Sequence, residues 1–247
     1  IFMDVTEREQ REALRREFSA NVSHELKTPL AGIRLLSDSI LQTQDMDAQT
    51  VREFVGDIEQ ESERLARITE NLLRLTRLDS GLLPEAQRVD LSSVVARVAR
   101  MLRLVAEEKK VDLSYEVRRE GQTLASEDEI HEIIYNLTEN AIKYNHPGGF
   151  VKLALAGDED NCLLTVSDDG IGIPEEDMPR IFDRFYRVDK SRSKSTGGTG
   201  LGLAITKQLV DRMDGSIELK SKAGVGTTVI VKIPFKIGTQ LSLIHIS

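Results

Sequence analysis

The sequence contains one cysteine in 247 residues, Cys162. A single cysteine cannot form an internal disulfide, which excludes a disulfide-stabilised secreted fold. Cys162 lies in the apolar run CLLTV. We therefore expect a buried, reduced thiol in a cytosolic protein.

Long apolar runs and an excess of positive charge are absent as well. No run approaches the roughly 20 apolar residues that cross a bilayer, and no signal peptide is recognisable. The formal net charge is −8, with acidic and basic residues interspersed, which argues against a nucleic-acid-binding surface. A hydrophobic content of 40% and a charged content of 30% are typical of globular proteins. The length allows one large domain or two modest ones.

Two long helical patterns fill the first third of the chain. Apolar residues recur at spacings of three and four from about residue 6 to 42 and again from about 48 to 78. QTQDMD separates the two patterns, and DSGLLPE ends the second. Pro29 should bend the first helix, because its ring crowds the carbonyl of Glu25. We expect an antiparallel hairpin whose apolar stripe is buried in a dimeric four-helix bundle; a single-chain hairpin packed on the second domain is the alternative.

After residue 84 the pattern changes to short strands and amphipathic helices. Strands are predicted at 88–90, 111–117, 151–157, 162–169, 215–222 and 226–235, and helices at 91–108, 126–145 and 200–213. Adjacent strands with segregated helices indicate an α/β sandwich with a mixed sheet. The last ten residues fit no periodic pattern, and we expect them to lie outside the fold.

His24 is the first candidate for chemistry. Glu25 follows it directly, and Thr28 lies one helical turn further along the same face. A neutral imidazole is a competent nucleophile near neutral pH, and a neighbouring carboxylate can orient it and accept its second proton. Taken alone, the stretch is explained more simply by a surface histidine on an amphipathic helix.

Three further stretches contain the residue types of a nucleotide site. NLTENAIKYN places Asn136, Asn140 and Lys143 on one helix, where amide oxygens suit Mg²⁺ and an ammonium suits phosphate. In SDDGIGIP, Asp168 can accept a hydrogen bond from an exocyclic amine, which would favour adenine over guanine. TGGTGLGLAI brings exposed N–H groups to a helix N-terminus, where phosphate binds readily. A polar helix face, a turn and a solvated loop are the simpler explanations of each stretch alone.

Together and in this order, the stretches resemble the sensor histidine kinases of two-component systems. FSANVSHELKTPLAGI matches their H box, NLTENAIKYN the N box, DDGIGIP the G1 box, IFDRFYRVD the F box and GGTGLGLAI the G2 box. The resemblance covers about residues 12–236 and implies the Bergerat ATP-binding fold shared with gyrase, Hsp90 and MutL. RVDKSRSKST would be a lid that nucleotide orders. IFMDVTEREQREALRREF resembles the exit from a PAS sensor domain into a signalling helix, as in PAS-linked, phosphate-sensor-like members.

The resemblance implies an ATP-dependent autokinase that phosphorylates His24 and passes the phosphoryl group to an aspartate of a cognate response regulator, whose phosphatase it would also be. Glu25 would be the acid/base partner of His24, and Thr28 would position water for dephosphorylation. Arg187 would reach the γ-phosphate, and Asn140 would hold Mg²⁺. The other nucleotide-binding residues that the family implies are Asn136, Lys143, Tyr144, Asp168, Gly170, Gly172, Ile173, Phe185, Gly198, Gly200, Leu201, Gly202 and Thr227.

The family also implies partners and a location. The chain would be a homodimer that uses ATP and Mg²⁺ and binds a response-regulator receiver domain, with no nucleic acid. It would be the cytoplasmic portion of a membrane-anchored bacterial sensor, touching the membrane only through missing upstream segments. The implied domains are 1–12, a signalling-helix remnant; 13–82, the phosphotransfer hairpin; 83–87, a linker; 88–236, the ATP-binding domain; and 237–247, a non-native or disordered tail. An ATPase or Ser/Thr-type kinase of the same fold, and a dimeric ATP-binding scaffold that only relays conformation, are the alternatives.

Overall fold

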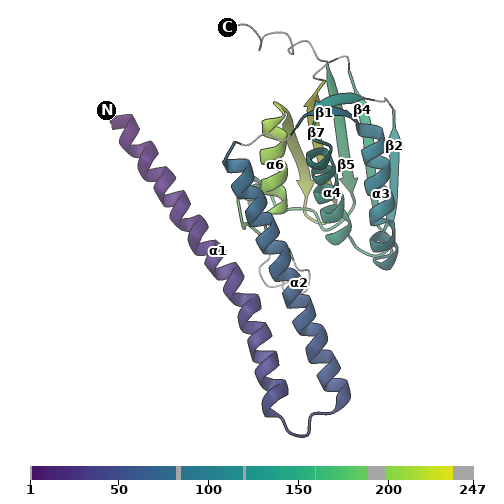
Figure 1. The fold of residues 1–247 in the computed structure, drawn as a ribbon. Coiled ribbons are helices and arrows are strands. Elements are labelled where there is room, and N and C mark those ends of the chain that lie inside the picture. The colour runs from purple at the N-terminus through teal and green to yellow at the C-terminus, as the bar shows by residue number, and fades with distance from the viewer. Residues whose placement is uncertain (1, 82–84, 119–120, 159, 189–197, 236–247) are drawn as a thin grey trace.

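The chain folds into a long helical hairpin followed by an α/β domain (Figure 1). The structure is a computed structural model and describes residues 2–81, 85–118, 121–158, 160–188 and 198–235. The hairpin consists of α1 (Phe2–Gln42) and α2 (Ala48–Asp79), which run antiparallel. Asp47 caps α2, because its carboxylate accepts hydrogen bonds from the N–H groups of Gln49 and Thr50, both at 2.9 Å.

The first helix is continuous and begins earlier than the sequence pattern predicts, at Phe2. It passes through Pro29, whose side chain is buried. The bend expected at this proline stays a prediction. Within the described ranges, no helix combines the length and the apolar character that crossing a membrane would require.

The α/β domain is built on a five-stranded sheet of order β2-β4-β5-β7-β6. Its strands are β2 (Asp112–Val117), β4 (Phe150–Gly157), β5 (Asn161–Asp168), β6 (Ser216–Lys222) and β7 (Gly226–Pro234). β2 and β4 pair in parallel and all other neighbours are antiparallel, so the predicted mixed sheet is confirmed. A separate two-stranded sheet pairs β1 (Gln87–Asp90) with β3 (Gln122–Ala125).

Helices cover one face of the large sheet (Figure 1). They are α3 (Leu91–Glu108), α4 (Glu127–Lys143) and α6 (Gly202–Arg212), and a short 3₁₀ helix, η1, spans Met178–Arg180. The sequence pattern did not predict β3 or η1. β3 has only four residues, QTLA, and its partner β1 lies more than 30 residues earlier, so no local periodicity marks it.

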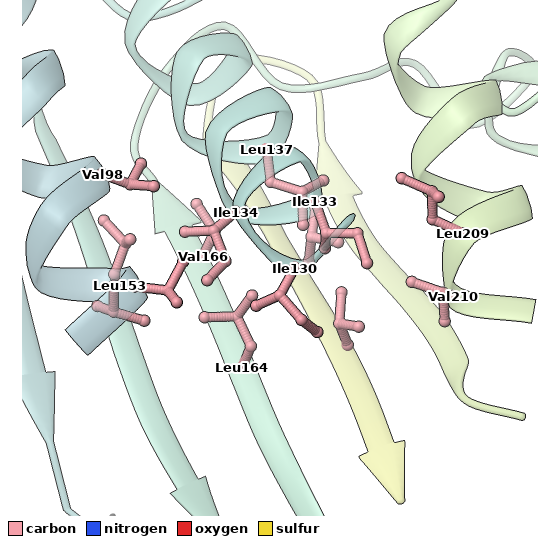
Figure 2. Close-up of a cluster of buried hydrophobic side chains, with 14 of the residues drawn as sticks. Val98, Ile130, Ile133, Ile134, Leu137, Leu153, Leu164, Val166, Leu209 and Val210 are labelled. Carbon is pink, nitrogen blue, oxygen red and sulfur yellow. The ribbon is translucent and has the colours of Figure 1, made fainter. Parts of the chain in front are cut away.

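The core lies between this sheet and its helices (Figure 2). Alternate residues of the strands point toward the helices, which present one apolar face each. The side chains that meet there include Val98, Ile130, Ile133, Ile134, Leu137, Leu153, Leu164, Val166, Leu209 and Val210. Cys162 is buried in the same core, and burial raises the pKa of its thiol to about 12, which confirms the expected buried thiol.

The hairpin is attached to the α/β domain through the end of α2. Leu75 and Leu78 are buried within the core of that domain, and Phe18 of α1 packs against it. Asp79 accepts hydrogen bonds from Arg184 Nη2 and from Gln208 Nε2, both at 2.8 Å. One face of the hairpin therefore packs on the second domain, as the single-chain alternative predicts.

The other face of the hairpin remains exposed. On α2, the buried residues are Arg64, Ile68, Leu75 and Leu78, whereas most of the predicted four-three stripe is half-buried or exposed, with Val55 53% exposed. The predicted and the buried stripes differ because the single chain buries the face that contacts α1 and the α/β domain. Leu30 and Leu35 of α1, at 59% and 68% exposure, add to the apolar surface left uncovered.

A cluster of charged side chains is enclosed where α2 meets α4. Glu132 of α4 is paired with Arg74 of α2, and its side chain is only 14% exposed. Burial raises the pKa of Glu132 to about 7; Arg74 opposes the rise, and the carboxylates of Glu129 and Glu70 add to it. Arg212 of α6 in turn pairs with Glu129 at 3.4 Å. Glu132 is thus a group that titrates near neutral pH inside the interdomain contact.

The substitution Glu132→Gln should change how stability depends on pH. The folded-state pKa of about 7 exceeds the ordinary value of 4.5, so between these values the folded chain binds more protons than the unfolded chain. The contribution of Glu132 is present below the lower value and lost as the pH rises through the upper one. Relative to the variant, the wild type should lose about 1–3 kcal/mol of unfolding free energy between about pH 5 and about pH 8, measured by urea unfolding. The same difference at both pH values would contradict this.

Candidate active site

His24 is presented to solvent from the middle of α1. Its side chain is 79% exposed, and its Nδ1 lies 3.7 Å from Oε1 of Glu25, whose side chain is 21% exposed. Thr28, one turn further, is exposed and donates its hydroxyl hydrogen to the carbonyl of His24 at 3.1 Å. The three predicted residues of the H box are therefore neighbours, with the imidazole open to an incoming group.

Arg64 of α2 joins this group, and the sequence reasoning missed it. Its Nη2 lies 3.2 Å from Oε2 of Glu25, and its Nη1 lies 3.7 Å from Oε2 of Glu61. The side chain of Arg64 is only 10% exposed. The one signal in the sequence is that Arg64 shares a helical face with two apolar residues, Ile68 and Leu75; only the structure shows that this face is buried.

Asp168 is the last residue of β5, the central strand, and lies close to the C-terminal end of α4. Its Oδ1 accepts a hydrogen bond from the N–H of Gly170 at 2.9 Å. Burial raises the pKa of Asp168 above its ordinary range, while the N–H groups of Gly170 and Thr227 oppose the rise and Asp169 adds to it. A carboxylate held in this way can accept a further hydrogen bond from an amino group.

The turn after Asp168 leaves no room for side chains. A Cβ on Gly170 would lie 2.6 Å from the carbonyl oxygen of Tyr144, and one on Gly172 would lie 2.0 Å from the carbonyl oxygen of Lys222. Ile173 donates its N–H to a serine hydroxyl of β6 at 2.8 Å. The predicted G1 residues therefore bring the chain into direct backbone contact with the end of α4 and with β6.

The second glycine-rich turn is fastened to Phe185. Gly200 has a φ of +70°, and a Cβ there would lie 2.8 Å from the carbonyl carbon of Phe185. Phe185, itself at a φ of +66°, donates its N–H to the carbonyl of Gly200 at 2.8 Å. The ring of Phe185 lies 5.7 Å from that of Phe18 on α1. The turn and the hairpin are thus connected through one aromatic pair.

Three predicted polar residues surround Gly198. A Cβ on Gly198 would lie 2.7 Å from Nζ of Lys143, 3.4 Å from the hydroxyl of Tyr144 and 3.6 Å from Nη2 of Arg187. Burial lowers the pKa of Lys143 to about 8; Glu139 opposes this, and Arg187 adds to it. An ammonium and a guanidinium beside backbone N–H groups form an environment suited to phosphate.

Asn136 and Asn140 lie one turn apart on α4. A Cβ on Gly202, the first residue of α6, would lie 3.8 Å from Cγ of Asn136, so this amide faces the N-terminus of α6. In the described part of the chain, no three His, Cys, Asp or Glu side chains form a metal-binding cluster. An amide oxygen is a hard ligand of the kind that Mg²⁺ accepts beside phosphate and water.

Some expected residues are placed differently or not described. The side chain of Leu201 is fully buried in the core, and its N–H donates to Oγ1 of Thr199 at 3.3 Å, so neither group is open to a ligand in this arrangement. Thr199 is also bonded by Asn71 of α2 at 3.1 Å, a contact that the sequence did not predict. Residues 189–196 of the predicted lid, RVDKSRSKST (187–196), lie outside the described residues.

Arg187 connects the two halves of the site. Burial lowers its pKa, the hydroxyl of Tyr144 and the carboxylate of Glu25 raise it, and the guanidinium of Arg64 lowers it. Arg187 therefore lies within electrostatic reach of Tyr144 on the α/β domain and of Glu25 beside His24. The tertiary structure has brought the H box to the glycine-rich turns.

A helical hairpin with an exposed histidine, joined to an α/β domain with two glycine-rich turns, defines a class that the comparisons identify. The His Kinase A (phospho-acceptor) domain matches residues 14–81, and the histidine kinase-, DNA gyrase B- and HSP90-like ATPase domain matches residues 125–237. The chain belongs to the sensor histidine kinases, of which it contains the phosphoacceptor hairpin and the ATP-binding domain.

Similar proteins carry the same family name. The chain is 39% identical over 232 residues to the sensor-like histidine kinase SenX3 of Mycolicibacterium smegmatis, covering 94% of this chain and 60% of the relative. It is 35% identical over 245 residues to the sensor histidine kinase WalK of Bacillus subtilis, covering 96% of this chain and 39% of the relative. The chain thus spans between 39% and 60% of the length of these two relatives.

Solved structures share the fold. Full-length ShkA in complex with AMPPNP matches with a TM-score of 0.65 and 27% identity over 89% of this chain and 46% of that one. The histidine kinase ThkA in complex with the response regulator protein TrrA matches with a TM-score of 0.73 and 22% identity, over 94% of this chain and 65% of that one. These likenesses extend across both the hairpin and the α/β domain.

The substitutions Gly200→Ala and Gly224→Ala should separate backbone strain from crowding. Gly200 and Gly224 have φ of +70° and +74°, but only at Gly200 would a Cβ meet another atom within 4 Å, the backbone of Phe185. Both variants should lose about 1 kcal/mol of unfolding free energy through strain. Gly200→Ala should lose more and should also weaken ATP binding, measured by urea unfolding and calorimetric titration. Equal losses in the two variants would contradict the crowding at Gly200.

Proposed function

We propose that this chain transfers the γ-phosphoryl group of ATP to His24 and then to an aspartate of a response regulator. The observation that carries the proposal is the exposed imidazole of His24, whose Nδ1 lies 3.7 Å from Oε1 of Glu25, in a chain that also gathers Lys143, Tyr144 and Arg187 around Gly198. A cation such as Arg187 beside the glycine-rich turn can neutralise charge on a phosphoryl group that leaves ATP.

The geometry of the H box supports an attack through Nε2 of His24. Nδ1 is the nitrogen that faces Glu25, which leaves Nε2 as the outward nitrogen of an exposed ring. As the Nε2–phosphorus bond forms and the bond to the β-phosphate oxygen breaks, ADP leaves and the imidazole becomes cationic. Glu25 then takes the Nδ1 proton, so that the phosphorylated ring is neutral.

The ATP-binding residues divide by the part of the nucleotide they suit. Asp168, a carboxylate held by backbone N–H groups, is suited to the amino group of adenine. Lys143 and Arg187, with the N–H groups that follow Gly198, are suited to phosphate. Asn140, with Asn136 nearby, would hold Mg²⁺, which when bound supplies positive charge to the phosphates.

The exposed face of the hairpin supports a homodimer. Leu30, Leu35, Val55 and Leu73 are between 53% and 68% exposed after the hairpin has packed on its own α/β domain. A second copy would bury these side chains in a four-helix bundle.

Thr28 is exposed one turn from His24, and its hydroxyl oxygen retains lone pairs that could position water in a phosphatase reaction with the regulator.

Whole-protein properties extend the proposal. This chain spans 60% or less of the two relatives described above. We infer that upstream segments supply a sensor, of the PAS type that the N-terminal sequence resembles, and a membrane anchor. The chain would then be the cytoplasmic portion of that sensor.

The substitution His24→Gln should abolish phosphorylation while leaving ATP binding intact, since the side chain of His24 is 79% exposed and its replacement should not disturb the fold. Wild-type chain incubated with [γ-³²P]ATP should acquire a label that is labile in acid and stable in base, and the variant should acquire none. His131→Gln, on α4, is the matched control and should retain the label. Acid-stable label would indicate a Ser/Thr-type kinase, and retained ATP binding with no label on wild type would indicate a scaffold.

ATP affinity should fall as the pH rises through the pKa of Lys143. Burial has lowered this pKa to about 8, so the charged ammonium that suits phosphate is present below that value and lost above it. Between about pH 7 and about pH 9 the dissociation constant of ATP should rise about tenfold, measured by calorimetric titration. Lys143→Arg should bind with little pH dependence, and Lys143→Gln should bind weakly at both values. If the ATP dissociation constant of Lys143→Gln rose with pH as steeply as that of the wild type, this role would be excluded.

A further inference from the structure

Arg64 is a buried cation whose hydrogen bonding depends on Glu25. Its Nη2 donates to Oε2 of Glu25 at 3.2 Å, whereas the 3.7 Å between its Nη1 and Oε2 of Glu61 is too long for a hydrogen bond. Among the described residues, its Nε has no hydrogen-bond partner. A guanidinium remains charged at all biological pH values, so a nearly enclosed one requires a counter-charge. In this structure Glu25 provides the nearer counter-charge, and Glu61 lies 3.7 Å away as a second one.

The two oxygens of Glu25 face different groups. Oε2 is engaged by Arg64 on α2, and Oε1 lies 3.7 Å from Nδ1 of His24 on α1. A charge-assisted hydrogen bond at one oxygen restrains the position of the carboxylate. The second oxygen thereby stays close to the imidazole, at a separation that a small rotation would shorten to a hydrogen bond.

We propose that Arg64 is a positioning residue for phosphoryl transfer, which anchors Oε2 of Glu25 so that Oε1 can take the Nδ1 proton of His24. The inference rests on the proposed function and concerns a residue that acts only through Glu25. It explains why a charged side chain occupies an otherwise apolar face of α2, beside Ile68 and Leu75.

The test is the rate of His24 labelling under single-turnover conditions, measured over a range of ATP concentrations. Arg64→Gln should lower the maximal rate about tenfold, while the half-saturating ATP concentration stays within about twofold. Arg64→Lys, which keeps a charge within reach of Glu25, should stay within about threefold of wild type. Glu61→Gln, which removes the other acidic neighbour of Arg64, is the matched control and should change the rate less than about twofold.

A double substitution tests whether Arg64 acts through Glu25. Arg64→Gln combined with Glu25→Gln should be as slow as Glu25→Gln alone, because the anchored group is already gone. Losses that multiply would overturn the inference, as would a Glu61→Gln variant as slow as Arg64→Gln. Should Arg64→Gln fail to fold by circular dichroism, the smaller loss in Arg64→Lys must vanish in the Glu25→Gln background. Wild type that acquires no label on His24 would instead refute the proposed function.

Discussion

The burial of the last turns of α2 in the α/β domain determines where every other part of the site lies. Leu75 and Leu78 belong to the hydrophobic core of that domain, and each buried leucine contributes about 2 kcal/mol by leaving water. The partly exposed hydrogen bonds that Arg184 and Gln208 donate to Asp79 contribute less, but they form only in one relative orientation of the groups. Apolar contact therefore holds the two parts together, and polar contact selects the rotation about α2. The contact of α1 with Phe185, beside the second glycine-rich turn, follows from that rotation.

Burial displaces the pKa of several charged groups in this region. Lys143, Arg187 and Asp168 each have a pKa displaced toward the neutral form, and burial is the largest cause in all three. Such displaced pKa values are common at functional sites. An incoming nucleotide with its phosphates would complement the two cations. The structure thus resembles a site arranged for a ligand of opposite charge.

Local periodicity predicted the fold wherever a single element could bury one face. The long helices were predicted from the spacing of apolar residues, and the mixed sheet from the order of strands and helices along the chain. β3 was not, since four residues pairing with a distant strand carry no period of their own. The buried stripe of α2 was also displaced, because Arg64 contacts Glu25 of α1 and Leu75 packs in the core of the α/β domain, while the predicted stripe is half-buried or, as at Val55, exposed. An apolar stripe predicted from residue types does not indicate which partner buries it.

The sequence by itself determined the chemical inventory: His24 with Glu25, the asparagines of α4, Asp168 and the glycines of the two turns, several of which would strain or crowd a larger residue. These are properties of short segments, in which residue type and spacing decide the local conformation. The tertiary structure alone decided that Arg64 engages Glu25 and that Arg187 lies between the hairpin and the nucleotide-binding turns. Those relations join residues from separate elements. They depend on packing across the whole chain, which no local pattern records.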